Sequence, residues 1–184
     1  MPYNIIKEDL NGIKLIEPKI FSDNRGYFFE SFNQNDFEEL GITETFVQDN
    51  QSSSKLGTIR GIHFQYNNPQ GKLERVLRGT AIFRIVDIRI DSPFFGQYRE
   101  YKLSEENKLL LWVPKGFGNS FSAESEEVVI HYKCTNFWDA KSEISILYND
   151  KDIGINWNNE SPKVSDKDLN GISLKQWKEM NIKI

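Results

Sequence analysis

The chain has 184 residues and a formal net charge of -4, with 23 Lys and Arg residues against 27 Asp and Glu residues. The basic residues are scattered and form no block that could follow a phosphate backbone, which argues against a nucleic-acid binder. The amino-terminal residues lack the pattern of a signal peptide, no apolar run is long enough to span a membrane, and the single Cys134 cannot form an internal disulfide, so we expect a cytoplasmic protein.

The first part of the chain predicts a turn and a short helix. Two short apolar runs flank Asp23-Asn24-Arg25-Gly26, which is a turn signal, and residues 27–32 then predict a strand. Residues 35–41 predict a short helix, because an Asn or Asp cap and early acidic residues precede a terminal glycine. A second short helix is expected near the end of the chain, at residues 173–180.

From Thr45 onward the chain predicts strands and turns. The candidate strands are separated by Gly, Pro, Asn or Asp and lie at residues 46–54, 58–65, 73–78, 81–89, 97–103, 108–113 and 128–135. No helical segment intervenes between them, so the sheet should be antiparallel. We found no internal repeat or linker. The sequence therefore predicts one all-β domain spanning residues 1–184, an antiparallel jelly-roll barrel with a few short peripheral helices.

One predicted strand holds an unusual pair of polar residues. His63 is one of only two histidines in the chain and follows Arg60 by three positions. In a regular strand these two side chains would point to opposite faces of the sheet. A twist or bulge at Gly61 would be needed to bring both into one pocket. The alternative is that His63 is a hydrogen-bonded core residue and that Arg60 is a solvated edge charge.

The residue types favour acid–base chemistry without a metal. Two histidines and no His-x-His pair do not make a histidine-rich metal site, although a mixed site using Glu74 or Glu30 is an alternative. Cys134 resembles a small buried hydrophobic residue more than a nucleophile. A histidine base held by a carboxylate, a tyrosine proton donor on the opposite side, and a cation for an oxyanion would together support epimerisation next to a carbonyl.

A series of short motifs occurs in order along most of the chain. They include Asp23-x-Arg25-Gly26-x-Phe28-x-Glu30, Gln48-Asp49-Asn50-x-Ser52, Arg60-Gly61-Ile62-His63-Phe64-Gln65, Gln70-Gly71-Lys72-Leu73, Asp87-Ile88-Arg89-x-x-Ser92-Pro93, Trp112-Val113-Pro114-x-Gly116-Phe117, Tyr132-Lys133-Cys134-Thr135 and Ser165-x-Lys167-Asp168. No single motif is decisive, but the ordered set resembles the dTDP-4-dehydrorhamnose 3,5-epimerase family of nucleotide-sugar epimerases.

The resemblance implies a cupin-type jelly roll that uses no metal or cofactor and works as a homodimer. It implies that His63 is the catalytic base, that Asp168 is its carboxylate partner, and that Tyr132 donates the proton. Lys72 matches the lysine beside the sugar keto oxygen. The residues implied to bind the nucleotide sugar and its diphosphate are Arg25, Glu30, Gln48, Asn50, Arg60, Glu143 and Lys167, with Trp138 stacked on the nucleotide base.

The sequence departs from the family pattern at one place near the substrate. The family commonly has Gly-Phe-Ala-His-Gly-Phe, whereas this chain has Gly116-Phe117-Gly118-Asn119-Ser120-Phe121. Asn119 can still form hydrogen bonds to a substrate, but it cannot titrate near neutral pH.

We expect an epimerase that inverts C3, C5 or both in a nucleoside diphosphate 4-keto-6-deoxy sugar, with dTDP-4-dehydro-6-deoxyglucose as the main candidate. The alternatives are another nucleotide-linked 4-keto sugar such as a GDP-heptose, a 3,4-keto isomerase, and a non-catalytic sugar-binding jelly roll. In the last case His63 and Asp168 should lie beyond hydrogen-bond reach of each other. His131 is assigned no role, because it should point away from the barrel if its neighbour Tyr132 points in.

Overall fold

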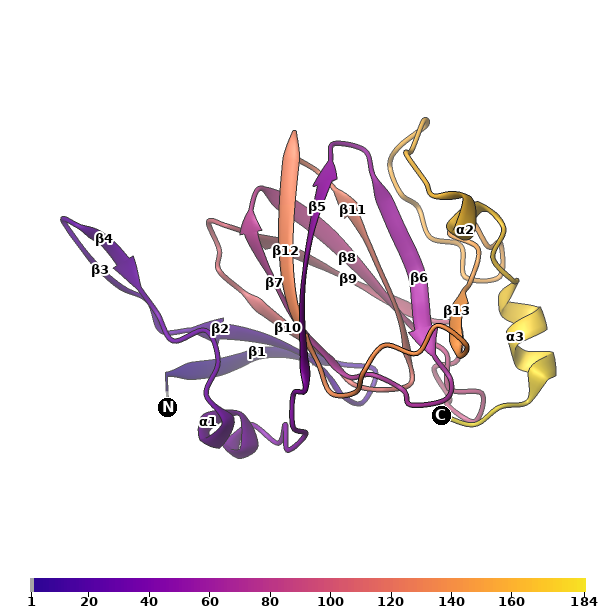
Figure 1. Cartoon of the computed structure of the whole chain (residues 1–184), viewed down its shortest axis with the longest axis horizontal. Coiled ribbons are helices and arrows are strands. Elements are labelled where there is room, and N and C mark those ends of the chain that lie inside the picture. Colours follow the sequence, from indigo (N-terminus) through magenta and orange to yellow (C-terminus); the bar gives the residue numbers. More distant parts are fainter. Residues whose placement is uncertain (1) are drawn as a thin grey trace.

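Two antiparallel sheets face each other in the computed structural model, which describes residues 2–184 (Figure 1). The first sheet contains, in spatial order, β1 (Tyr3–Asp9), β2 (Ile13–Pro18), β10 (Leu110–Val113), β7 (Lys72–Arg78), β12 (Glu127–Cys134) and β5 (Gln48–Lys55). The second sheet contains β13 (Glu143–Ser145), β6 (Ile59–Gln65), β11 (Phe117–Ala123), β8 (Thr80–Asp87) and β9 (Tyr98–Ser104). Strands that are distant in the sequence are paired, as in a jelly roll, so the predicted fold class is confirmed.

The core lies between the two sheets and is built from alternate residues of each strand. On β10, Leu111 and Val113 point inward, whereas Leu110 and Trp112 point to the outer face. The inner cluster combines residues of both sheets, among them Ile13, Val76, Leu111, Val128 and Ile130 from the first and Phe83, Ile85, Leu103, Phe117 and Phe121 from the second. Burial of this apolar surface is the main force that holds the two sheets together.

Short helices cover the outer faces of the sheets. Helix α1 (Gln34–Glu39) places Phe37 on the outer cluster of the first sheet, and α3 (Leu174–Met180) places Trp177 against Phe64 of β6, with ring centroids 4.7 Å apart. Both helices lie where the sequence predicts them. Helix α2 (Asp166–Leu169) is a single turn capped by the Ser165 side chain. Within residues 2–184, none of these helices has the length and apolar character needed to cross a membrane.

A hairpin projects away from both sheets. Strands β3 (Phe21–Asp23) and β4 (Gly26–Phe28) pair only with each other, around the predicted turn, and extend from the barrel (Figure 1). The strand predicted at residues 27–32 is shorter than expected, because the chain leaves the hairpin after Phe28 and approaches the Asn33 cap of α1.

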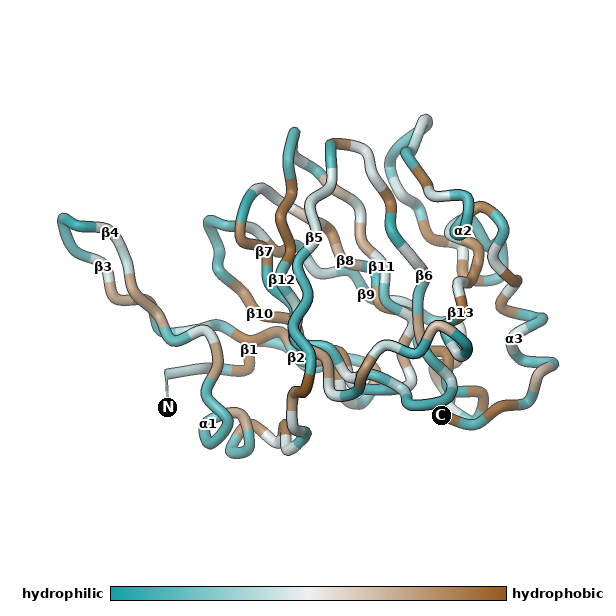
Figure 2. Tube along the Cα trace, viewed as in Figure 1, coloured by the Kyte–Doolittle hydropathy of each residue, from teal (hydrophilic) through white to brown (hydrophobic). Residues whose placement is uncertain are grey.

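Several strands were not predicted, and their composition explains why. All seven residues of β11 are buried, so this strand shows no alternation of polar and apolar residues. Strand β5, by contrast, is predicted at residues 46–54; it is hydrophilic along its length, as Figure 2 shows, and lies at the edge of the first sheet next to β12. This hydrophilic strand supplies several of the polar residues of the candidate site.

Candidate active site

A polar cavity opens between the two sheets. Its volume is about 120 Å³, and its lining comes from β5, β6, β7, β11 and β12: Ser52, Arg60, His63, Lys72, Glu74, Asn119, Ser120, Phe121, Ile130 and Tyr132. The sequence predicted functions for five of these residues, namely Arg60, His63, Lys72, Asn119 and Tyr132. The fold therefore brings into one cavity residues that are spread over more than seventy positions of the chain.

A β-bulge brings Arg60 and His63 to the same cavity. His63 pairs with Asn119 and Arg60 pairs with Phe121. The two paired residues are three positions apart on β6 but only two positions apart on β11, so β6 contains one extra residue between them. Gly61 lies inside this bulge with a φ of +114°, a conformation that side chains rarely adopt. A Cβ atom at this position would lie 2.6 Å from Ser120 Cβ. The expected distortion at Gly61 is confirmed, and the sequence uses glycine there because no side chain fits.

His63 forms a close pair with the buried Asp168 of α2. His63 Nε2 lies 2.5 Å from Asp168 Oδ1, and the Asp168 side chain also accepts hydrogen bonds from the Ser145 hydroxyl (2.7 Å) and the Gly61 amide (3.3 Å). Burial raises the pKa of Asp168, but the hydrogen bond and charge of His63 and the other donors outweigh it and lower the pKa to about 2. An ionised Asp168 can only accept, so the proton of the neutral imidazole lies on Nε2 and Nδ1 keeps a free lone pair.

Tyr132 faces His63 across the cavity, since it comes from β12 of the first sheet whereas His63 comes from β6 of the second. Burial, reinforced by Cys134 and Glu74, raises the pKa of Tyr132 to about 12, so the phenol carries its proton at neutral pH. Lys72 Nζ lies 5.6 Å from the centre of the Tyr132 ring. The cavity thus brings together an imidazole, a phenol and the amine of a lysine.

His131 points to the outer face of the first sheet, as expected from its place beside Tyr132. Its Nε2 lies 3.4 Å from Asp49 Oδ2, and both residues line a separate surface pocket with Arg75 and Lys133. It does not line the cavity that contains His63.

Glu74 lines the cavity although the sequence suggested it only as an alternative metal ligand. Its side chain points inward two positions after Lys72, and the residue is 4 % exposed. Burial raises the pKa of Glu74 to about 7, against the opposing effects of Lys72 and Asn119. Asn119 approaches Glu74 closely enough to lower its pKa, but neither Asn119 Nδ2 nor Glu74 Oε2 has a hydrogen-bond partner of good geometry.

A second group of predicted residues forms a connected chain of contacts. Lys167 Nζ pairs with Glu143 Oε2 at 2.5 Å, and Trp138 Nε1 donates to the same oxygen. The Trp138 backbone amide donates to Gln48 Oε1, and Gln48 donates to Asn50. This group lies beside the cavity, because Asn50 of β5 is paired with Tyr132 of the neighbouring strand β12, and Lys167 directly precedes Asp168 in the chain. The structure therefore brings together all five of these predicted binding residues.

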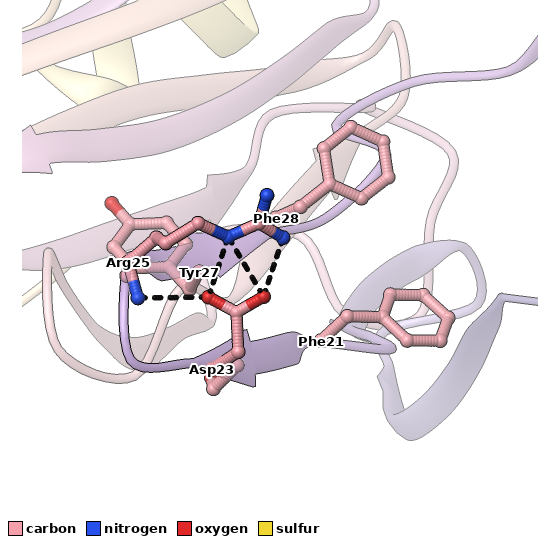
Figure 3. Close-up of a pocket in the computed structure, with 7 residues that line it drawn as sticks. Phe21, Asp23, Arg25, Tyr27 and Phe28 are labelled. Carbon is pink, nitrogen blue, oxygen red and sulfur yellow. Dashed lines mark hydrogen bonds and ion pairs between the residues drawn. The ribbon is translucent and has the colours of Figure 1, made fainter.

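Arg25 and Glu30 are not brought to the cavity of their own chain. Arg25 lies on the projecting hairpin, where its guanidinium donates to both carboxylate oxygens of Asp23, as Figure 3 shows. The Glu30 carboxylate accepts a hydrogen bond from Asn33 near the start of α1. Neither residue lines the cavity within one chain.

The alternative metal site and the Cys134 nucleophile find no support in the described part of the chain. In residues 2–184, no group of three or more His, Cys, Asp and Glu side chains is arranged to hold a metal ion. Cys134 is buried, and burial raises the pKa of its thiol to about 11, so it is a poor nucleophile at neutral pH. Chemistry without a metal or cofactor stays a prediction from the sequence.

The comparisons with known proteins agree with one another. Residues 7–176 match the family model for dTDP-4-dehydrorhamnose 3,5-epimerase. The chain is 49 % identical over 167 residues to the dTDP-4-dehydrorhamnose 3,5-epimerase of Salmonella typhimurium, covering 89 % of this chain and 91 % of the relative. It is 41 % identical to the enzyme of the same name from Methanothermobacter thermautotrophicus, covering 95 % of this chain and 96 % of that one.

A solved structure shows that the likeness extends to the fold. The dTDP-6-deoxy-D-glucose-3,5-epimerase of Legionella pneumophila, crystallised in complex with dTDP-4-keto-L-rhamnose, superimposes with a TM-score of 0.91 at 45 % identity. The match covers 94 % of this chain and 93 % of that one. The protein described here belongs to the dTDP-4-dehydrorhamnose 3,5-epimerase family.

Proposed function

We propose that this protein inverts C3 and C5 of a nucleoside diphosphate 4-keto-6-deoxy sugar, converting dTDP-4-dehydro-6-deoxyglucose to dTDP-4-dehydrorhamnose. The observation that carries the proposal is the placement of the His63–Asp168 pair and Tyr132 on opposite walls of one cavity. A base and an acid on opposite sides of a substrate carbon are what inversion by proton exchange requires. The 2.5 Å distance between His63 and Asp168 argues against a binding module that has no use for such a pair.

In the proposed reaction, the C4 carbonyl makes the hydrogens on C3 and C5 acidic. The free Nδ1 of His63 removes one of them, and Asp168 stabilises the imidazolium that forms. The electrons of the broken C–H bond move toward the C4 oxygen, where Lys72 stabilises the enolate charge. Tyr132 then delivers its proton to the same carbon from the opposite face. Solvent restores the proton to Tyr132 and takes the proton from His63.

The proposed binding groups suit an anionic nucleotide. Arg60 and Lys167 carry positive charge on the cavity side of β6 and at α2, where they would pair with the diphosphate. Trp138 is 60 % exposed. Its indole donates a hydrogen bond to Glu143 and its backbone amide donates one to Gln48, so its ring offers a fixed stacking surface for the nucleotide base.

We further propose that the protein is a homodimer in which the β3–β4 hairpin reaches the cavity of the second copy. The hairpin exposes Phe21, Tyr27 and Phe28 at 51 %, 60 % and 68 %, an apolar surface that one chain leaves uncovered. Arg25 and Glu30 would then complete the partner's nucleotide site rather than their own. The homodimer, the single-domain organisation and the cytoplasmic location are all expectations from the sequence, and the buried free Cys134 is compatible with a reducing compartment.

The proposed activity is tested by incubating the protein with dTDP-4-keto-6-deoxyglucose in deuterated water and following the sugar by NMR. We expect deuterium at C3 and at C5 together with the inverted product, because each proton removed by His63 is replaced by one from solvent. Exchange at only one of the two carbons, or at neither, would contradict the proposal. A 3-keto product would instead indicate an isomerase.

A further inference from the structure

Within residues 2–184, the cavity contains two buried polar atoms, Glu74 Oε2 and Asn119 Nδ2, that have no hydrogen-bond partner of good geometry. Among the side chains of residues 2–184, only Glu74 Oε2, Asn119 Nδ2 and Arg84 Nη2 are buried without a hydrogen-bond partner. Glu74 and Asn119 are 4 % and 7 % exposed, and both line the cavity that holds His63, Lys72 and Tyr132. A buried polar atom without a partner is costly, so two of them beside one cavity point to a ligand that supplies the missing bonds.

The two atoms are complementary to a hydroxyl group. An ionised Glu74 accepts hydrogen bonds, whereas Asn119 Nδ2 donates them. A hydroxyl can donate one hydrogen bond and accept another, so a single sugar hydroxyl could satisfy both atoms. Glu74 comes from β7 of the first sheet and Asn119 from β11 of the second, which places such a hydroxyl where the two walls of the cavity meet.

The position of Lys72 identifies which hydroxyl this would be. Lys72 and Glu74 are two residues apart on β7 and share its inner face, so they present neighbouring binding groups along the strand. Removal of the C3 hydrogen gives an enolate whose two oxygens, on C3 and C4, lie on adjacent carbons in one plane. Removal of the C5 hydrogen places the ring oxygen beside the C4 oxygen instead of a hydroxyl, so C3 carries the only hydroxyl next to the C4 oxygen.

We propose that Glu74 and Asn119 bind the C3 hydroxyl of the sugar while Lys72 binds the C4 oxygen, so that the pair selects 3-hydroxy substrates and assists proton exchange at C3. This inference rests on the proposed function and adds a specificity determinant to the same site. Glu74 accepts the hydroxyl hydrogen, and Asn119 donates to the hydroxyl oxygen. The pair holds the C3–C4 edge of the ring in the plane that the enolate requires.

The test compares deuterium exchange at C3 for two substrates, dTDP-4-keto-6-deoxyglucose and its 3-deoxy counterpart. The proteins are the wild type, Glu74→Val and Asn119→Ala, with folding checked by circular dichroism. We expect each substitution to reduce the preference for the 3-hydroxy substrate about 10-fold or more, as loss of a hydrogen bond to a charged or buried group does. One substitution removes the acceptor on the first sheet and the other removes the donor on the second sheet. The same loss of preference in both variants would therefore not come from a local distortion of one strand.

Ser120→Ala serves as the matched control. Ser120 lines the same cavity, but its hydroxyl already donates to the Arg84 carbonyl at 2.6 Å and has no hydrogen left to donate to a sugar. Its substitution should change exchange of both substrates by the same factor. The inference is overturned if Glu74→Val and Asn119→Ala also lower both rates equally, or lower neither. A wild-type protein that exchanges neither substrate would contradict the proposed function itself, which is a different result.

Discussion

His63 Nε2 lies 2.5 Å from Asp168 Oδ1, although 105 positions separate the two residues in the chain. The contact depends on α2, a single helical turn whose Ser165 cap directs Asp168 toward β6. Ser145 and the Gly61 amide hold the same carboxylate, so its position does not depend on His63 alone. The pair fixes both the orientation of the imidazole and the ring nitrogen that is left free of Asp168.

Replacing Asp168 by Asn should lower kcat about 100-fold or more, within the range that a general base contributes. An amide can present its NH2 group to Nε2, and the imidazole would then place its proton on Nδ1, where the base is needed. Nucleotide affinity should change little. Steady-state kinetics with dTDP-4-keto-6-deoxyglucose would measure both quantities.

The control for this variant is Ser145→Ala, which removes one donor to Asp168 but leaves the carboxylate in place. We expect a much smaller loss of kcat than for Asp168→Asn. Equal losses in the two variants would show that the carboxylate acts only by supporting the local structure.

Glu74 should make the stability of the protein depend on pH. Its pKa is raised from 4.5 to about 7 by burial, so the unfolded chain loses this proton at a lower pH than the folded protein does. The wild type should therefore lose stability relative to Glu74→Gln as pH rises from about 4.5 to about 7, by about 3 kcal/mol in total. Urea unfolding of both proteins at several pH values measures this difference, and a difference that is constant with pH would contradict the raised pKa.

Gly61→Ala should destabilise the fold by about 3 kcal/mol, because the added methyl group would overlap Ser120 and the backbone conformation is unfavourable for alanine. Gly41→Ala is the matched control, since Gly41 also has a positive φ (+77°) but has open space around it. That variant should lose only about 1 kcal/mol. Urea denaturation of the two variants separates steric overlap from backbone strain, and equal losses would mean that the close packing at the bulge is unimportant.

Much of the fold follows from local sequence patterns, and β8 shows why. Residues 81–89 are rich in Ile, Val and Phe and predict a strand, which is found at Thr80–Asp87. The same rule fails for β11, whose Gly, Asn and Ser residues are buried on both faces. Strand β13 has only three residues, too few to show a pattern.

The candidate site depends on contacts that no local pattern contains. The convergence of Arg60 and His63 required a bulge that the sequence could suggest through Gly61 but not establish. The roles expected of Asp168 and Tyr132 came from resemblance to a family, since nothing near them in the sequence marks them as partners of His63. The sequence did not predict that Glu74 lines the cavity, because a charged residue on a strand is ordinarily solvated. Its burial becomes evident only when the two sheets are assembled.

Mixed dimers would test the proposal that the β3–β4 hairpin of each copy reaches the cavity of the other. We expect Arg25→Ala and His63→Ala to be impaired as separate proteins at limiting substrate. Co-expressed with different tags and purified as mixed dimers, they should recover about half of the wild-type activity, because one of the two sites then combines an intact cavity with an intact hairpin. No recovery would contradict the proposal that Arg25 acts in the partner's site.

The control is a mixed dimer of His63→Ala and Tyr132→Phe. Both substitutions lie in the cavity of their own chain, so neither site of this dimer has an intact set of catalytic groups. It should recover no activity, whatever the position of the hairpin.

The central claim is that two groups on opposite walls handle the proton, His63 removing it and Tyr132 returning it. The most direct test is Tyr132→Phe with dTDP-4-keto-6-deoxyglucose in deuterated water, with NMR following both deuterium incorporation and configuration at C3 and C5. We expect exchange to continue with little inversion, because His63 can return a proton to the face from which it came. Inversion that keeps pace with exchange as in the wild type would contradict the assignment of Tyr132 as the opposite-face acid.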